Sequence, residues 1–273
     1  MSELTLAVAQ FGATPNVDEN VTKSIDAIAM GADAGADLVV LPESSMYSDP
    51  LREHPDQRYS EPLDGPFVSA MQAAAAEHRV RVVVGVTEAV EGEHPFNTLA
   101  YITPEGKLEG VYRKVHLFDA FGHRESDSVQ AGEPEALIFD VNGVTVGAAT
   151  CYDIRFPEMS RFLVDRGADV IVLPTSWASG PMKEAHWETL LRARAIENTI
   201  YVAGSSQSGP RRIGASMIVD PMGVVIAALG EEDRGVAVAR INTKRIEATR
   251  LANPSLQNRK FTVQPLKLAG GTE

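Results

Sequence analysis

The sequence has one cysteine among 273 residues, and the usual signatures of a bound metal or cofactor are absent. A single thiol cannot form an internal disulfide and cannot build a cysteine-rich zinc site. The six histidines form neither an HExxH motif nor another close pair of metal ligands. No glycine-rich phosphate loop follows an expected strand, so nucleotide binding has no support. We therefore expect no metal and no organic cofactor.

Long apolar runs and clusters of basic residues are absent as well. No run approaches the roughly 18 apolar residues that cross a bilayer, and the N-terminal MSELTLAVAQFG lacks the pattern of a signal peptide. With 25 Lys and Arg against 37 Asp and Glu, the net charge is −12. This charge argues against nucleic acid as a partner and gives no reason to expect an anionic membrane. The sequence therefore predicts a soluble, cytoplasmic protein.

One ten-residue pattern occurs twice, as GADLVVLPES at 35–44 and as GADVIVLPTS at 167–176. Short Val/Ile/Leu runs of this kind are typical of strands buried on both faces. An apolar strand and a helical stretch precede each copy, and a helix, a strand and a hairpin follow it. A chance likeness between two common strands is the alternative, but the matching surroundings favour one α/β unit used twice.

The repeated order of strands and helices predicts mixed sheets with helices on their outer sides. Two such sheets facing each other would form a four-layer α-β-β-α sandwich with an internal pseudo-duplication. No Ser/Gly-rich or Pro-rich linker divides the chain, so we expect residues 1–273 to form a single domain. From about residue 250 the pattern fades into an extended tail, and such tails often pack on a partner subunit.

Four reactive side chains follow expected strands. Glu43 follows LVVLP, Cys151 follows VTVGAAT, Thr175 follows VIVLP, and Lys114 follows a hairpin strand that ends in VYR. Catalytic groups in α/β sheets tend to lie just past the carboxyl ends of strands. Taken singly, the cysteine could be a small buried apolar residue, the glutamate a capping carboxylate and the lysine a surface residue. One fold could instead bring all three together.

A cysteine, a glutamate and a lysine that converge can hydrolyse an amide. The thiol needs a base, because the thiolate is the nucleophile and the nearby Asp153 disfavours it. Glu43 is the candidate base, and Lys114 with a backbone N–H near Tyr152 would stabilise the developing negative oxygen. A thioester would form, the amine would leave, and Glu43 would activate the water that releases the acid.

The three motifs resemble those of the nitrilase, or carbon–nitrogen hydrolase, superfamily. Glu43 in LPES, Lys114 in RKVHLFD and Cys151 in CYDIRFPE match its Glu-Lys-Cys triad in order and local sequence. The likeness spans about residues 4–262 and includes the helical AHWETLLRARAIEN at 185–198. The resemblance implies the α-β-β-α sandwich, homodimers or larger assemblies, and hydrolysis of carbon–nitrogen bonds other than peptide bonds.

The segments CYDIRFPE, GPMKEAHWE and LRARAIEN resemble the Nit branch, whose members act as ω-amidases or on deaminated glutathione. This resemblance implies an amidase that releases ammonia from a small carboxylate-bearing amide. It implies Arg155 as the ligand of that carboxylate and Glu125 as a second glutamate that orients the lysine or the substrate. Tyr47 and Thr175 are weaker candidates for the pocket wall.

Alternatives remain for individual residues and for the activity. Arg155 could form a structural salt bridge with Glu158 or Asp153, and Glu125 could be a solvated loop carboxylate. Ala215 stands where many Nit relatives have histidine, and the preceding loop looks short, which leaves the substrate open. An N-carbamoyl amino-acid amidohydrolase uses the same triad and is the main alternative. A true nitrilase and a catalytically silent binding protein on the same scaffold are further ones.

Overall fold

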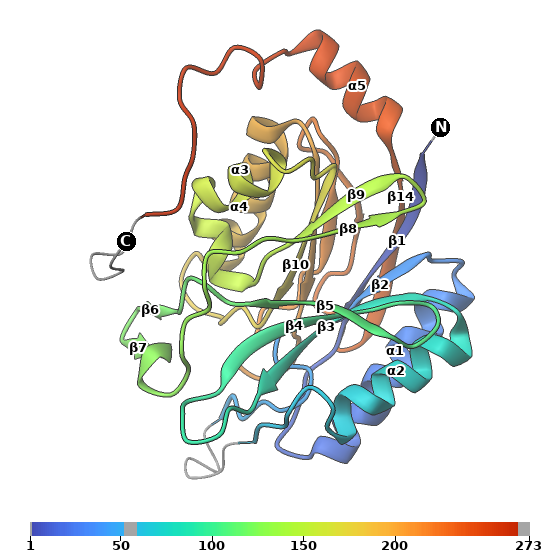
Figure 1. The fold of residues 1–273 in the computed structure, drawn as a ribbon, viewed down its shortest axis with the longest axis vertical. Helices are drawn as coiled ribbons and strands as arrows, with labels where there is room; N and C mark the ends of the chain where they lie inside the picture. The colour runs from blue at the N-terminus through green and yellow to red at the C-terminus, as the bar shows by residue number, and fades with distance from the viewer. Residues whose placement is uncertain (1, 52–58, 267–273) are drawn as a thin grey trace.

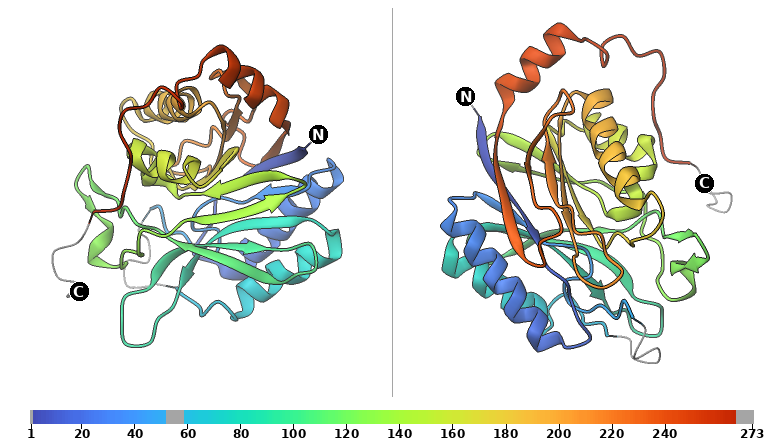
Figure 2. Two further views of the ribbon diagram at one scale, coloured as in Figure 1. Left: turned by 45° about the horizontal axis from the view of Figure 1, so that its top comes forward. Right: turned by 180° about the vertical axis from the view of Figure 1, so that it is seen from behind.

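The computed structural model describes residues 2–51 and 59–266 (Figure 1). Two six-stranded sheets face each other, and helices cover their outer sides, as the turned views in Figure 2 show. The covering helices are α1 (Val17–Asp33) and α2 (Pro66–His78) on the first sheet, and α3 (Pro157–Val164) and α4 (Lys183–Asn198) on the second. This arrangement confirms the predicted α-β-β-α sandwich.

The two sheets repeat one topology. Three parallel strands run through the centre of each, an antiparallel hairpin follows on one side, and one antiparallel strand closes the other. The first sheet has the order β14-β1-β2-β3-β4-β5 and the second β13-β12-β11-β10-β9-β8. The first contains β1 (Glu3–Gln10), β2 (Leu38–Val40), β3 (Arg81–Glu88), β4 (Phe96–Ile102), β5 (Leu108–Arg113) and β14 (Gly235–Asn242). The second contains β8 (Leu137–Val141), β9 (Val144–Ala148), β10 (Val170–Thr175), β11 (Tyr201–Ser206), β12 (Met217–Val219) and β13 (Val225–Ala228).

Burial on both faces of the central strands explains their continuous apolar runs. In β1, Leu4, Leu6 and Val8 point into the core between the sheets, whereas Ala7 and Ala9 face the helices α1 and α2. Alternation of side chains along a strand produces this division. Within residues 2–51 and 59–266, no helix is both long and apolar enough to cross a membrane. The cytoplasmic location stays a prediction.

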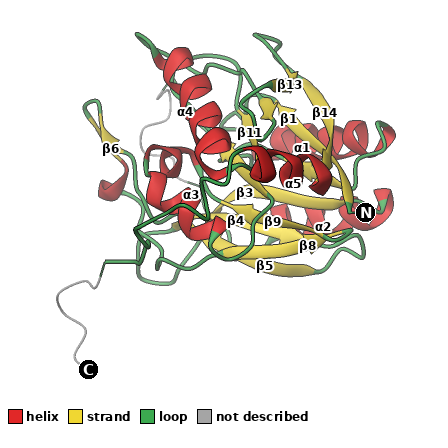
Figure 3. Ribbon diagram, turned by 90° about the horizontal axis from the view of Figure 1, so that it is seen from above, coloured by secondary structure: helices red, strands yellow, loops and turns green. Residues whose placement is uncertain are grey.

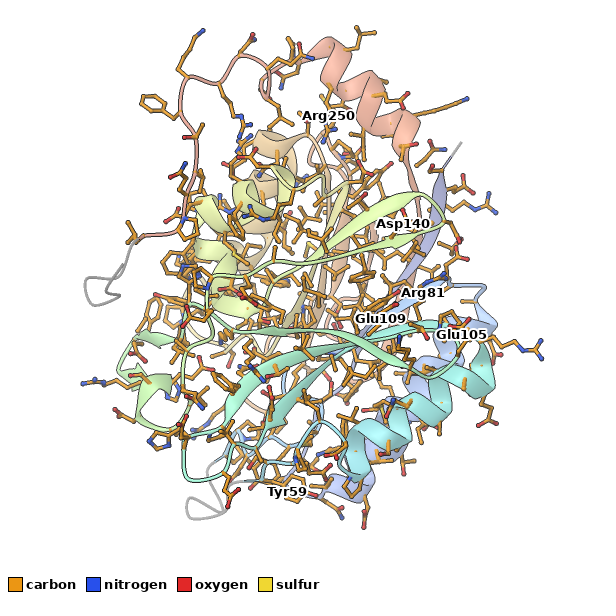
Figure 4. The ribbon with its side chains drawn as sticks, viewed as in Figure 1. Tyr59, Arg81, Glu105, Glu109, Asp140 and Arg250 are labelled. Carbon is orange, nitrogen blue, oxygen red and sulfur yellow. The ribbon has the colours of Figure 1, made fainter. Side chains whose placement is uncertain are left out.

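The two ends of the sandwich differ. At one end lie charged side chains of strand starts and hairpin turns, among them Arg81, Glu105, Glu109 and Asp140 (Figure 4). At the other end lie the carboxyl ends of the parallel strands and the short hairpin of β6 (Asp119–Ala120) and β7 (His123–Arg124). The 3-10 helices η1 (Glu125–Asp127) and η2 (Cys151–Arg155) belong to this second end. The polar segments that the sequence placed after strands therefore gather there.

The chain ends in α5 (Thr243–Ala252) and an irregular segment (Figure 3). Residues 253–266 contain turns but neither helix nor strand. Arg259 forms an ion pair of 2.7 Å with Asp165 at the end of α3, and Val263 packs against the core. Phe261 and Leu266 in the same segment are 88% and 87% exposed. The tail is thus docked at some points and leaves large apolar side chains in solvent.

Candidate functional site

A cavity of about 720 Å³ opens at the carboxyl ends of the central strands. Its lining includes six of the residues predicted for the site, which are Glu43, Lys114, Glu125, Cys151, Tyr152 and Arg155. Glu43 follows β2, Lys114 follows β5 and Cys151 follows β9. The strand-end rule therefore located all three where the two sheets meet.

Cys151 lies at a sharp turn between β9 and η2. Its φ angle is 47°, in the left-handed region, which costs a non-glycine residue roughly 1–3 kcal/mol and is common at functional sites. The turn is held by a capping box in which the Thr150 N–H donates to Asp153 Oδ2 at 2.8 Å. The first backbone hydrogen bond of η2 comes from the Asp153 N–H, which leaves the Tyr152 N–H at the free end of the turn.

Asp153 fixes this turn from beneath. The Tyr112 hydroxyl donates to its Oδ2 at 2.7 Å, and His116 Nδ1 lies 2.8 Å from its Oδ1. The Asp153 side chain is fully buried, so these polar partners are what make its burial tolerable. Asp153 thereby supports the turn that carries Cys151 and does not pair with Arg155.

Contacts from both halves of the chain fix the segment that carries Glu43. Gln207 of the second half donates from Nε2 to the Glu43 backbone carbonyl at 2.6 Å. On the other side, Gly85 of β3 lies so close that a Cβ there would be 2.6 Å from Glu43 Cα. No larger residue fits at that position without moving the glutamate.

Glu43 is 4% exposed, and both oxygens of its carboxylate accept hydrogen bonds. Its Oε1 accepts from Lys114 Nζ at 3.0 Å and from Asn97 Nδ2 at 2.8 Å, and its Oε2 accepts from the Ser176 N–H at 2.7 Å. Burial by itself raises the pKa of Glu43, but Lys114 and Asn97 outweigh it and hold the pKa below its ordinary value. Glu43 is therefore ionised at neutral pH.

Lys114 is 2% exposed and lies between two carboxylates. Its Nζ is 3.0 Å from Glu43 Oε1 and 2.9 Å from Glu125 Oε2. Burial lowers the pKa of Lys114, but the two glutamates outweigh it and raise the pKa well above its ordinary value. An ammonium has three N–H donors. Two of them bond the glutamates, so one is left for another acceptor.

The Cys151 thiol is 8% exposed and uncharged at neutral pH. Burial and the neighbouring Glu43 charge raise its pKa to about 12, although Lys114 and Thr175 act in the opposite direction. Thr175 Oγ1 is buried, and among the described residues no atom forms a hydrogen bond of ordinary geometry with it. The resting site thus combines a neutral thiol, an ionised glutamate and a charged lysine.

The sequence reasoning missed Asn97, at the start of β4. Its Nδ2 donates to Glu43 Oε1 at 2.8 Å and to Glu125 Oε1 at 3.0 Å, so one amide holds both carboxylates that flank Lys114. Glu125 also accepts from the Phe118 N–H at 2.7 Å. The only sequence signal for Asn97 was a polar residue near the start of an apolar strand, which is common in hairpins.

Arg155 lines the cavity without an acidic partner. No carboxylate of the described residues lies within ion-pair distance of its guanidinium, and its Nε is buried without a hydrogen bond. Its charged group lies 4.9 Å from the Trp177 ring centre and 5.6 Å from that of Phe121. The alternative of a salt bridge with Asp153 or Glu158 is therefore wrong.

Three further cationic residues line the cavity and were not predicted, namely Lys183, Arg211 and Arg212. The two pocket-wall candidates lie elsewhere. Thr175 lies beside the Cys151 thiol, whereas Tyr47 stacks on Tyr59 at 6.2 Å between ring centres and is not among the lining residues.

A metal site was not expected, and no group of three or more His, Cys, Asp or Glu in residues 2–51 and 59–266 is placed to hold a metal ion. That the reaction needs no cofactor stays a prediction.

Comparisons with known proteins agree on one family. The family model described as carbon-nitrogen hydrolase matches residues 5–251. The chain is 33% identical over 258 residues to a deaminated glutathione amidase of Escherichia coli O157:H7, covering 94% of this chain and 98% of that protein. It is 30% identical over 282 residues to an omega-amidase of Xenopus laevis, covering 98% and 100%.

A solved structure of the amidase from Nesterenkonia sp. AN1 has a TM-score of 0.79 at 26% identity and covers 95% of this chain and 94% of that one. It is a glutamate-to-glutamine mutant with covalent addition of the acetamide moiety of fluoroacetamide at the active site cysteine.

Proposed function

The chain belongs to the carbon–nitrogen hydrolase family and is a hydrolase of non-peptide carbon–nitrogen bonds, and from this premise we propose an amidase that uses Cys151 as its nucleophile and acts on a small carboxylate-bearing amide. The observation that carries the proposal is the convergence of one thiol, one ionised glutamate and one charged lysine in a single cavity. The covalent adduct at the cysteine of the related amidase supports the same assignment.

In the first step, the sulfur attacks the amide carbon while Glu43 takes the thiol proton. The two events are coupled, because a thiol with a pKa of about 12 does not ionise beforehand. The carbonyl oxygen becomes negative and accepts from the third N–H of Lys114 and from the free N–H of Tyr152. Each such donor typically contributes about 3–4 kcal/mol to transition-state stabilisation.

In the second step, the tetrahedral intermediate collapses to a thioester. Protonated Glu43 gives its proton to the departing nitrogen, and the C–N bond breaks. Glu43, again ionised, takes a proton from water as the water attacks the thioester carbon. The C–S bond then breaks, the sulfur regains a proton, and the carboxylic acid leaves.

Asn97 and Glu125 act as positioning residues in this scheme. Asn97 holds Glu43 and Glu125 at a fixed separation, and Glu125 holds Lys114 so that its remaining N–H faces the cavity. Such an arrangement keeps the donors in place before the charge develops, which is the main requirement of electrostatic catalysis. Thr175 lies beside the sulfur but does not line the cavity.

Arg155 is the proposed ligand of the substrate carboxylate. Its guanidinium lines the cavity without a carboxylate partner in the described part of the chain, and aromatic rings fix its direction. Relatives named deaminated glutathione amidase and omega-amidase support an amide as substrate. No observation favours the N-carbamoyl alternative, and the full triad argues against a silent binding protein.

A screen of substrates tests the function directly. Release of ammonia or amine is measured for ω-amides of dicarboxylic acids, deaminated glutathione, N-carbamoyl amino acids and short nitriles. We expect kcat/KM for the best carboxylate-bearing amide to exceed that for its uncharged analogue by at least about tenfold, since one charged contact contributes about 1.5–3 kcal/mol. Turnover confined to N-carbamoyl compounds, with carbon dioxide as a product, would contradict the amidase.

The charge states of the resting site predict a flat pH profile. A glutamate with a lowered pKa stays ionised down to acidic pH, and a thiol with a pKa of about 12 stays protonated to alkaline pH. The active form therefore persists between about pH 6 and pH 9, and kcat/KM should change less than about twofold across that range.

An alkaline inflection near the ordinary pKa of a thiol would mean that the thiolate exists before substrate binds. Titration of Lys183 would add a separate inflection to the pH profile, because burial and the charge of Arg155 lower the pKa of Lys183. The Lys183→Met variant separates the two cases, since it removes the lysine and leaves the thiol.

We also propose a homodimer or larger homo-oligomer. Leu251, Phe261 and Leu266 near the end of the chain are 87%, 88% and 87% exposed, which is unusual for large apolar side chains unless a partner covers them. Their place on the tail agrees with the expected subunit contact. Light scattering on the purified protein measures the mass, and a monomer at micromolar concentration would contradict the proposal.

A further inference from the structure

The second copy of the ten-residue repeat has threonine where the first copy has glutamate. Glu43 is the ninth residue of GADLVVLPES, and Thr175 is the ninth residue of GADVIVLPTS. Each directly follows the proline at the end of a Val/Leu/Ile run that forms a central parallel strand. The pseudo-duplication therefore places Thr175 in the second half at the position that the general base occupies in the first half.

The pairing of β9 with β10 brings Thr175 beside the nucleophile. The two strands are parallel, and their last paired residues are Ala148 and Val172. The Ala149 N–H donates to the Val172 carbonyl at 3.1 Å and extends this alignment. Three residues further along each segment stand Cys151 and Thr175, so the register carries the two side chains to the same level. The sheet, and not the lining of the cavity, thus fixes the position of Thr175 relative to the sulfur.

Thr175 carries a buried hydroxyl group at the end of an apolar strand. The residue is 0% exposed, and no atom in residues 2–51 and 59–266 forms a hydrogen bond of ordinary geometry with its Oγ1. A buried hydroxyl without a partner is costly, and most buried hydroxyls are hydrogen-bonded. Valine has a similar shape and would avoid this cost. A hydroxyl at this position therefore points to a partner that the resting site does not supply.

The Cys151 sulfur becomes such a partner during the reaction. A neutral thiol is a weak acceptor, whereas hydrogen bonds to charged groups are strong. The sulfur gains negative charge as its proton passes to Glu43, and again when the C–S bond of the thioester breaks. The thiol pKa of about 12 means that this charge is costly, and hydrogen bonding by the Thr175 hydroxyl lowers that pKa.

A neutral donor also suits this position better than a second carboxylate. A glutamate here, as in the first copy of the repeat, would place another negative charge beside the sulfur and raise the pKa of the thiol further. The two copies thus present complementary groups to one sulfur, a proton acceptor from the first half and a hydrogen-bond donor from the second.

We propose that Thr175 is a catalytic residue that donates a hydrogen bond from Oγ1 to the Cys151 sulfur when the sulfur carries negative charge. In the first step the thiol proton moves to Glu43, and a sulfur electron pair forms the C–S bond. In the last step the C–S bond breaks, the sulfur keeps the bonding pair, and it takes the proton that Glu43 removed from water. Thr175 keeps its own proton throughout. This inference rests on the proposed amidase function and adds a residue to that site.

Thr175→Val tests the inference because it removes the hydroxyl and nearly keeps the shape of the side chain. We expect kcat/KM to fall by about tenfold or more, the effect of one hydrogen bond to a charged group. The factor should be the same within about twofold for every substrate of the screen, because the hydroxyl contacts the enzyme's own sulfur and not the substrate.

Alkylation by iodoacetamide measures the same contact without turnover. Cys151 is the single cysteine, so the gain in mass reports on it alone. At about pH 8 the alkylation rate of Thr175→Val should be about threefold lower than that of wild type, because a tenfold smaller thiolate fraction is partly offset by a more nucleophilic sulfur.

Stability separates this role from packing. Thr175→Val replaces an unpaired buried hydroxyl by a methyl group, so its urea midpoint should equal or exceed that of wild type. Thr175→Ser keeps the hydroxyl and loses a buried methyl group, so kcat/KM should stay within about threefold while the midpoint falls.

Thr249→Val is the matched control. Thr249 is 3% exposed, does not line the cavity, and donates from its hydroxyl to the Arg245 carbonyl at 2.8 Å. Its replacement should lower the urea midpoint and leave kcat/KM within about twofold.

The outcomes separate this inference from the function on which it rests. Wild-type kcat/KM and alkylation rates in Thr175→Val, or equal losses of activity in Thr175→Val and Thr175→Ser, would overturn the role of the hydroxyl and leave the amidase intact. A Thr175→Val protein that is less stable than wild type would give the hydroxyl a structural role instead. Failure of the wild-type protein to hydrolyse any amide would overturn the amidase itself, whereas alkylation would still test the contact with the sulfur.

Discussion

Replacing Cys151 by alanine is expected to lower kcat by about 10⁶-fold, because removal of the nucleophile from a group that acts as a unit abolishes its whole contribution. The fold should persist. Alanine is close to cysteine in size, both carry the same left-handed backbone cost, and the capping box of Thr150 and Asp153 stays in place. We expect the free energy of unfolding to change by less than about 1 kcal/mol. Steady-state rates and urea unfolding measure the two quantities.

The single cysteine makes the intermediate easy to assign. Intact-mass spectrometry of the wild-type protein with a slow substrate should show one acyl group, and the Cys151→Ala variant should show none. Turnover by the folded variant within tenfold of wild type would contradict a covalent mechanism. An acyl group that appeared on the variant would contradict Cys151 as the site of attachment.

Replacing Lys114 by methionine should impair both activity and stability. The variant leaves Glu43 and Glu125 buried without their shared cation, which typically costs about 3–5 kcal/mol of stability. It also removes one donor to the developing oxyanion, a loss of about 10²–10³ in rate. Without its counterion, buried Glu43 regains the tendency to take up a proton, so the base is weakened as well. We expect kcat/KM to fall by about 10⁴ or more.

Lys107→Met is the matched control. Lys107 lies on the turn between β4 and β5, is exposed and does not line the cavity. It removes the same charge and should leave kcat/KM within about twofold and stability within about 0.5 kcal/mol. A folded Lys114→Met protein with kcat/KM within tenfold of wild type would exclude Lys114 from the reaction.

The sequence could predict the residues that a local rule locates. Glu43 and Cys151 each follow a continuous apolar run, and such a run signals a buried strand whose end lies at a site. Lys114 follows a hairpin strand in the same way. Strand assignments and the family motifs were enough to predict these three side chains. The structure places all three along one cavity.

The residues that the sequence could not predict depend on contacts between distant segments. Asn97 reaches Glu43 only because β4 lies beside β3, and this register is set by the whole sheet. Lys183 lines the cavity from the start of a helix and Arg212 from a loop. No periodic pattern in the sequence predicts where side chains point at such positions. Tyr47 shows the reverse case, since it follows the LPES motif closely yet stacks on Tyr59 outside the lining.

The closing strand of the first sheet had no clear sequence signal either. β14 lies in the region before the pattern fades, and it pairs along its full length with β1 at the other end of the chain. Its burial alternates only weakly, because it lies at the edge of the sheet and one face is partly open. A pairing between residues more than 200 positions apart leaves little trace in either strand alone.

The repeated topology has a consequence for the chemistry. The glutamate and the lysine belong to the first repeat and the thiol to the second, and Gln207 and Ser176 of the second repeat hold the glutamate in place. Under the proposed mechanism each half on its own is chemically incomplete, because one half has the base and the cation without a thiol, and the other has the thiol without a base. The proposed mechanism therefore depends on the alignment of the two halves as directly as on any single side chain.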